Sequence, residues 1–137
     1  MSDVTVLSID MIVSNPKIRS GRPIIAGTTL PVTLTWQAVG DLTGQQLTAF
    51  VHLLNSEGRV VAQEDHVPQR GERPTSGWLP GEVVADRYDL SLRADLTPGT
   101  YVLEIGLYWA DGRRLRVSEP ERWQARDSVV MGTVRIR

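Results

Sequence analysis

Two histidines, His52 and His66, are the residues of this sequence best suited to acid–base or metal chemistry, and Glu64 and Asp65 directly precede the second of them. Imidazole nitrogens and carboxylate oxygens are common zinc ligands, and the same groups serve as general acids and bases. The segment 55–58, Asn-Ser-Glu-Gly, is a turn sequence that would join the two histidine-bearing segments as a β-hairpin. Histidine and carboxylate side chains could therefore meet on one hairpin.

The expected register of that hairpin keeps these groups apart. We expect Leu54 to pair with Val60 across the turn. His52 then lies opposite Ala62, and His66 falls near the end of its strand. Because no three ligands share a focus in this arrangement, we predict packed or surface histidines, no metal and no cofactor. A hydrolase that depends on His52 or His66 is the least favoured hypothesis.

Other catalytic patterns are missing from the sequence. It contains no Gly-x-Ser-x-Gly elbow and no phosphate-binding glycine loop, and it has no cysteine for thiol chemistry. Asp86 and Asp89 are a close pair of carboxylates, but their odd separation on a strand places them on opposite faces. A glycosidase needs two carboxyls that face one sugar. We predict that the protein is not an enzyme.

Aromatic side chains outside the expected core are the best candidates for ligand binding. Trp78 and Trp123 lie in polar segments, and Tyr108 points away from its apolar neighbours. Exposed rings of this kind can stack on the apolar faces of sugars, and ligand sites are often lined by aromatic groups. The alternative is that Trp78 and Trp123 are lids that fasten loops over sheet edges.

Arginines accompany these aromatic residues. Arg122 and Arg126 flank Trp123 and could bind sugar hydroxyls. With three nearby arginines they could instead form a phosphate or acidic-glycan patch; these are Arg113, Arg114 and Arg116. A charged face that protects an edge strand from aggregation explains the same pattern without any ligand.

Length and charge limit the classes of protein that the chain could be. Its 137 residues are the size of one domain, which we place at 1–137. Fifteen basic and sixteen acidic side chains leave a net charge of -1, so no overall field attracts nucleic acid. No apolar run reaches the ~20 residues that cross a bilayer, and the first residues do not resemble a signal peptide. We expect a soluble chain, without direct insertion into a membrane.

The elements that must position these residues are β-strands. Alternation of period two is clearest over 30–38 and 101–109, where it places Trp36 and Trp109 in the core. Further strands are predicted over 4–13, 18–25, 45–54, 60–65, 83–93, 114–117 and 129–136. Turn residues separate them, and a long Pro- and Gly-rich segment, 67–82, would cross from one sheet to the other. A second irregular segment, 118–127, carries Trp123.

The segment 96–101 resembles the tyrosine corner of sandwich domains. Tyr101 follows Pro98 and Gly99 at the start of a predicted strand, where the ring would fill core volume and the hydroxyl would bond to the backbone just upstream. Tyr101 and Gly99 are thus expected structural residues. The pattern predicts an all-β, immunoglobulin-like sandwich of two antiparallel sheets with about seven to nine strands.

Residues 50–117 also resemble an uncharacterised immunoglobulin-like domain of bacterial membrane-associated, glycosyltransferase-like proteins. The resemblance rests on Phe-Val-His-Leu at 50–53, Trp-x-Pro-Gly-Glu at 78–82, and Pro-Gly-x-Tyr at 98–101. It implies an extracytoplasmic accessory domain, and it implies no activity or ligand.

Three functions agree with these patterns. The first is a non-catalytic extracytoplasmic interaction module that uses the segments 67–82 and 118–127 to bind a protein or a glycan. The second is a carbohydrate-binding module that uses loop aromatics. The third is an assembly subunit in which the terminal strands, at open edges, pair by β-strand addition. The sequence leaves the oligomeric state open.

Overall fold

The computed structural model describes residues 4–7, 11–14, 23–38, 42, 44–114 and 128–137, and these form a sandwich of two four-stranded sheets. Sheet A has the order β1-β2-β3-β6, with β1 at Val4–Leu7, β2 at Met11–Ser14, β3 at Thr29–Ala38 and β6 at Val83–Ser91. Sheet B has the order β5-β4-β7-β8, with β5 at Val60–His66, β4 at Thr48–Leu54, β7 at Gly99–Tyr108 and β8 at Val129–Ile136. Every pairing of named strands is antiparallel.

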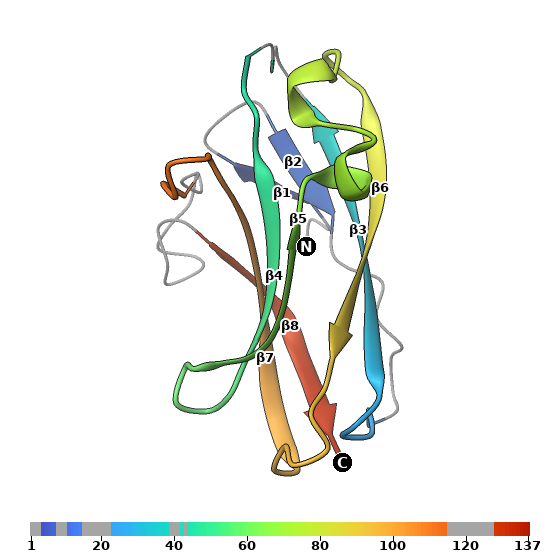
Figure 1. The fold of residues 1–137 in the computed structure, drawn as a ribbon, viewed down its shortest axis with the longest axis vertical. Helices are drawn as coiled ribbons and strands as arrows, with labels where there is room; N and C mark the ends of the chain where they lie inside the picture. The colour runs from blue at the N-terminus through green and yellow to red at the C-terminus, as the bar shows by residue number, and fades with distance from the viewer. Residues whose placement is uncertain (1–3, 8–10, 15–22, 39–41, 43, 115–127) are drawn as a thin grey trace.

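This architecture confirms the predicted immunoglobulin-like sandwich, and Figure 1 shows the two sheets facing each other. The eight strands of the described residues fall within the expected number. Two short 3-10 helices lie in the crossover, η1 at Pro68–Gly71 and η2 at Thr75–Gly77. In the described part of the chain no helix has the length and apolar character of a membrane span.

The core lies between the sheets and follows the predicted alternation. On β3 the even-numbered side chains are buried and the odd-numbered ones point outward, because successive strand residues face opposite sides. Trp36 is fully buried, as expected, and its indole N–H donates to the hydroxyl of Tyr88 on the neighbouring β6. Trp109 is only half-buried and packs against the margin of the core.

Two predicted turns have the expected chemistry. The hydroxyl of Tyr101 donates to the carbonyl of Thr97 at 2.6 Å, which confirms the tyrosine corner where the chain enters β7 at Gly99. In the β4–β5 turn, the side-chain oxygen of Asn55 accepts bonds from two backbone N–H groups. Gly58 closes this turn with φ +76°, a conformation that glycine adopts without steric cost.

One predicted strand needs correction, and two others lie mostly outside the described residues. The strand expected over 4–13 is the hairpin β1–β2, since alternation alone does not reveal where a chain reverses. In the segment 18–25, Ile24 makes only an isolated bridge to Ile136, and residues 18–22 lie outside the described residues. Of 114–117, only Arg114 is described, and it bridges Tyr108.

The crossover 67–82 connects β5 of sheet B with β6 of sheet A, as the sequence predicts. It lies at one end of the sandwich, whereas the β4–β5 turn and the C-terminus lie at the other (Figure 1). Thr75 fastens it from within, because its hydroxyl accepts the N–H of Leu47 at 2.9 Å and donates to the carbonyl of Gln45. Both partners lie in the segment that leads into β4.

Candidate functional site

The outer face of sheet B carries a group of polar and aromatic side chains that the core does not use. Ala49, Val51 and Leu53 of β4 point into the core, so the residues between them point outward. The same parity holds on β7, where the residues between Leu103, Ile105 and Leu107 face outward. We define the outer-face cluster as Phe50, His52, Asp65, Glu104 and Tyr108.

Strand register brings this cluster together, and it differs from the expected register. Leu54 pairs with Val60 as predicted, but a bulge at Leu53/Leu54 shifts the remaining pairs by one. His52 therefore lies opposite Gln63 rather than Ala62. On its other side His52 lies opposite Glu104. The extra residue of a bulge cannot be seen in the alternation of a short strand, which is why the prediction was wrong.

His52 lies between two carboxylates but makes no hydrogen bond to either of them. Its Nε2 is 3.4 Å from Oδ1 of Asp65, and its Nδ1 is 3.6 Å from Oε1 of Glu104. The residue is only 8% exposed. Both ring nitrogens and Oδ1 of Asp65 are buried atoms without a hydrogen-bond partner. Buried polar atoms of this kind are uncommon and call for an explanation such as a bound group.

The remaining oxygens of the two carboxylates are held in place. Oδ2 of Asp65 accepts the hydroxyl of Tyr108 at 3.0 Å, and Oε2 of Glu104 accepts the hydroxyl of Ser128 at 3.0 Å. Each carboxylate therefore turns one oxygen toward His52 and anchors the other. The geometry of the cluster is set by three strands and by Ser128, which directly precedes β8.

The electrostatics of the cluster favour the ionised form of Glu104. His52 lowers the pKa of Glu104, and Ser128 and Arg114 act in the same direction against the opposing effect of burial. Partial burial raises the pKa of the Tyr108 hydroxyl, and the neighbouring Asp65 adds to this shift, so Tyr108 stays a hydrogen-bond donor.

Aromatic rings form one wall of the cluster. The ring of Phe50 lies 4.7 Å from that of His52 and 6.2 Å from that of Tyr108. The guanidinium of Arg114 lies over Phe50, 4.4 Å from the ring centre. Phe50 pairs across the strands with Gly106, which has no side chain to compete for this space. The wall is apolar beside the polar groups of His52 and its two carboxylates.

The arrangement does not suit a metal ion. The two nitrogens of His52 face different carboxylates, so one ion could be reached by only one nitrogen and one carboxylate. Within the described ranges no three His, Asp or Glu side chains are placed to hold a metal.

The second histidine belongs to a separate cluster between the sheets. His66 stacks on Tyr88 with ring centres 4.3 Å apart and planes within 6°. Its Nε2 is 2.9 Å from Oδ2 of Asp86, and its Nδ1 is 3.2 Å from Oε1 of Glu64. Burial, reinforced by Asp86, raises the pKa of Tyr88. This cluster joins β5 of sheet B to β6 of sheet A at one side of the sandwich.

Among the residues that the sequence singles out, Trp78 needs a correction. It is 2% exposed, and its indole N–H donates to the carbonyl of Arg73 at 2.9 Å. Because the ring belongs to the core, it fastens the crossover and does not offer a platform to a ligand. Trp123, Arg122 and Arg126 lie outside the described residues.

Of two further predicted residues, Tyr108 belongs to the outer-face cluster and Trp109 lies at the margin of the core. Tyr108 is half-buried on the outer face of sheet B, as its parity predicts. Trp109 donates its indole N–H to Oε1 of Gln45 at 3.1 Å and carries the guanidinium of Arg113 4.9 Å from its ring centre. Sequence reasoning missed Phe50 and Glu104, and it grouped Asp65 with His66, whereas the structure places Asp65 beside His52. Equal parity of Phe50 and His52 on one strand and of Glu104 and Tyr108 on another was the signal available.

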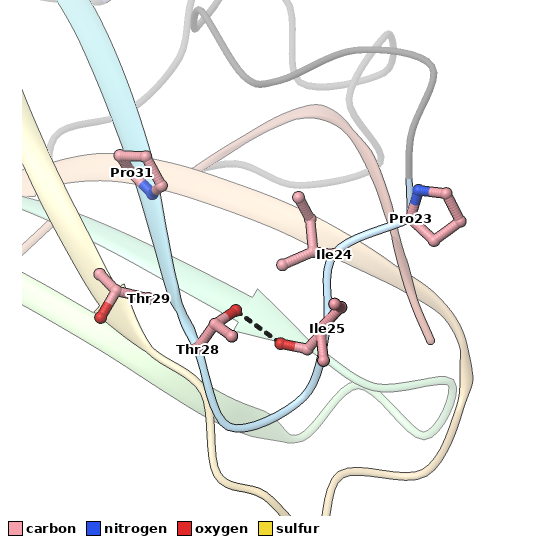
Figure 2. Close-up of a pocket in the computed structure, with 6 residues that line it drawn as sticks. All are labelled: Pro23, Ile24, Ile25, Thr28, Thr29 and Pro31. Carbon is pink, nitrogen blue, oxygen red and sulfur yellow. Dashed lines mark hydrogen bonds between the residues drawn. The ribbon is translucent and has the colours of Figure 1, made fainter.

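A pocket of about 490 Å³ lies at the start of β3 (Figure 2). It is lined by Pro23, Ile24, Ile25, Thr28, Thr29 and Pro31. The hydroxyl of Thr28 is used within the turn, where it donates to the carbonyl of Ile25 at 2.6 Å. None of these described lining residues has an ionisable side chain. They contribute apolar surface and the hydroxyls of two threonines.

Comparison with known proteins supports the fold and leaves the function open. The structure resembles the crystal structure of the C-terminal domain of Wzt, with a TM-score of 0.64 and 12% identity over 96% of this chain and 75% of that chain. It also resembles part of the Pseudomonas fluorescens alkylpurine DNA glycosylase AlkC bound to DNA with an abasic site analog, with a TM-score of 0.53 and 13% identity. A β-glucosidase from Listeria innocua in complex with isofagomine gives a TM-score of 0.50 and 17% identity.

The glycosylase match includes 95% of this chain and the glucosidase match includes 92%. The chain spans only 31% of the glycosylase and 16% of the glucosidase. At these identities the likeness shows a shared sandwich fold alone. No protein-family model matches the sequence, and no curated protein matches it.

Proposed function

We propose that this protein is a non-catalytic binding module and that it binds a saccharide at the outer-face cluster of sheet B. The observation that carries the proposal is the set of buried polar atoms without hydrogen-bond partners, Nδ1 and Nε2 of His52 and Oδ1 of Asp65. A buried donor or acceptor that stays unpaired costs about 1–3 kcal/mol. A ligand that pairs with all three atoms would recover this free energy on binding.

Saccharide hydroxyls match these atoms chemically. A hydroxyl both donates and accepts, so one hydroxyl can accept from an imidazole N–H of His52 and donate to a neighbouring carboxylate oxygen. The pairs at 3.4 Å and 3.6 Å are longer than ordinary hydrogen bonds, so these atoms have no hydrogen-bond partner in the protein. The half-buried Tyr108 lies beside them and can contact the apolar face of a sugar ring.

The same geometry disfavours hydrolysis. A glycosidase places two carboxyls on opposite sides of one scissile bond. In this cluster the imidazole of His52 occupies the space between Asp65 and Glu104. We therefore place both carboxylates in ligand binding and not in acid–base catalysis.

Glycan-array binding of the whole chain tests the proposal. We expect His52→Ala and Tyr108→Ala to abolish binding while unfolding remains cooperative. Trp78→Ala, which changes the core and not the outer face of sheet B, should leave the glycan preference unchanged. Arg87→Ala, on the outer face of sheet A, is the matched surface control. Unchanged array signals for both His52→Ala and Tyr108→Ala would refute the proposal.

Three predictions made from the sequence remain proposals, in addition to saccharide binding. They are a single domain over 1–137, the extracytoplasmic location implied by the resemblance, and the absence of nucleic-acid binding. Cell fractionation with a protease-accessibility assay tests the location, and an inaccessible cytoplasmic domain would contradict it.

Strand addition is a second candidate, because the terminal strands β1 and β8 are each outermost in their sheets among the described residues. The end of β8 is already occupied, since Ile24 exchanges backbone hydrogen bonds of 2.8 Å with Arg135 and Arg137. We therefore assign pairing to β1. Light scattering after size exclusion tests this candidate, and a strict monomer at high concentration would exclude it.

A further inference from the structure

We infer that the saccharide is acidic and that Arg135 and Arg137, at the end of β8, bind its anionic groups. This inference rests on the proposed function, because it extends the outer-face cluster along the same sheet face. It adds the charge of the ligand and the direction in which the ligand lies.

The strand register places the arginines on the face of the outer-face cluster. Arg135 pairs directly with Thr100 of β7, and directly opposed residues point to the same side of a sheet. Thr100 and Glu104 share a parity on β7, opposite to that of the core residues around them. Arg137 has the parity of Arg135. All of these side chains therefore face outward from sheet B.

The spacing fits a linear ligand of several sugar rings. Thr100 and Glu104 are four residues apart on β7, which corresponds to about 13 Å along the strand. A saccharide that lies along β7 can thus reach His52 and Glu104 with its hydroxyls and Arg135 with a charged group.

Arg135 and Arg137 differ from the other arginines in their partners. Six arginines of the described segments form ion pairs with carboxylates, namely Arg59, Arg70, Arg73, Arg87, Arg93 and Arg113. Neither Arg135 nor Arg137 has a carboxylate partner within the described residues, and both are exposed. The two are about 7 Å apart along the strand, so their side chains add to one local positive potential.

A pocket of about 490 Å³ adjoins these arginines and gives an anion a place to enter. Its lining consists of Pro23, Pro98, Gly99, Arg135, Ile136 and Arg137. Among the described lining residues, Arg135 and Arg137 are the two with charged side chains. Guanidinium binds carboxylate, sulfate and phosphate oxygens through paired N–H donors, and this chemistry is common to uronic acids and to sulfated or phosphorylated sugars.

The experiment compares acidic and neutral saccharides on the intact chain. A glycan array with uronate, sulfated, phosphorylated and neutral members first identifies the acidic saccharide that binds most tightly. Calorimetric titration then measures the affinity of this saccharide and of its neutral form. The neutral form is made by methyl esterification or by removal of the sulfate or phosphate. We expect the acidic form to bind about tenfold more tightly, and added salt to reduce that difference.

Variants separate the two proposals. Arg135→Gln with Arg137→Gln should remove the preference for the acidic form and leave the affinity for the neutral form unchanged. Arg93→Gln, at an exposed arginine paired with Asp95, is the matched control and should change neither affinity. His52→Ala should weaken both forms, which simple attraction between a polyanion and two arginines would not produce.

The possible outcomes are distinct. Equal affinity of the acidic and neutral forms, or an unchanged preference in the double arginine variant, overturns this inference and leaves the proposed function standing. The absence of binding to every saccharide on the array overturns both.

Discussion

At the residue scale, the hydrogen-bond partner decides what each polar side chain contributes. The hydroxyl of Tyr101 has one defined acceptor, the carbonyl of Thr97, and it connects the turn to β7. His52 has two carboxylates nearby and no hydrogen bond to either. The first arrangement is complete without a ligand, whereas the second leaves binding capacity unused. We therefore assign Tyr101 to stability, and His52 belongs to the proposed binding site.

Tyr101→Phe should lower the free energy of unfolding by about 1–2 kcal/mol, because the ring stays in the core while the carbonyl of Thr97 loses its partner. Urea unfolding measures this change. Tyr108→Phe, which loses a bond to the partly exposed Asp65, is the control and should cost less. Equal effects of the two variants would contradict the tyrosine corner as the stronger contact.

Stability should depend on the ionisation of Glu104. Its pKa is lower in the folded protein than the ordinary value of 4.5, so its contribution is complete above about pH 4.5 and is lost as the pH falls through the folded-state pKa. Glu104→Gln should therefore reduce the loss of stability on acidification, as measured by urea unfolding at neutral pH and near pH 3.5. Glu57→Gln, at an exposed position of the β4–β5 turn, should behave like the wild type on acidification.

At the scale of elements, the crossover 67–82 is an ordered connection rather than a free loop. Trp78 is buried and bonded to Arg73, and an ion pair between Arg73 and Glu82 closes the same segment. Thr75 ties it to the segment before β4 through two backbone groups. Since each contact holds the crossover against the core, this segment supports the sheets.

Thr75→Val should destabilise the protein by about 2 kcal/mol, because the buried N–H of Leu47 is left without an acceptor while the shape of the side chain is kept. Ser76→Ala removes a single exposed side-chain bond to Gln46 and should change stability by less than about 0.5 kcal/mol. Chemical denaturation of the two variants tests this difference, and a Thr75→Val variant as stable as Ser76→Ala would show that the crossover is not fastened at Thr75.

At the scale of the whole molecule, a polar contact joins the two sheets at the side where β5 and β6 are outermost. Asp86 is 5% exposed and accepts from His66, which belongs to the opposite sheet. Both ring nitrogens of His66 lie within hydrogen-bond distance of carboxylate oxygens, Nε2 with Asp86 and Nδ1 with Glu64.

His66→Leu should cost about 3 kcal/mol or more, because it leaves the buried carboxylate of Asp86 unpaired. The double variant His66→Leu, Asp86→Leu should recover much of that loss, since it removes the unpaired charge along with its partner. A double-mutant cycle of unfolding free energies measures the coupling. Additive effects of the two substitutions would show that the pair does not join the sheets.

Sequence reasoning determined the strands of the sandwich, the crossover between the sheets and the tyrosine corner, because alternation and turn chemistry are local properties of the chain. The burial of Trp36 followed from the same alternation. The burial of Trp78 did not, since its segment has no periodic pattern and depends on where the crossover packs. The failed strand over 4–13 has a similar cause, because a reversal within an apolar segment leaves the alternation intact.

Only the tertiary structure decided which side chains meet. One bulge at Leu53/Leu54 placed His52 opposite Gln63, and the pairing of three strands brought Asp65 and Glu104 to either side of His52. The same register placed Arg135 on the face of Glu104. The alternation along a strand shows which face of the sheet each residue takes. Its neighbours on the adjacent strands depend on register and bulges, which are set by long-range packing.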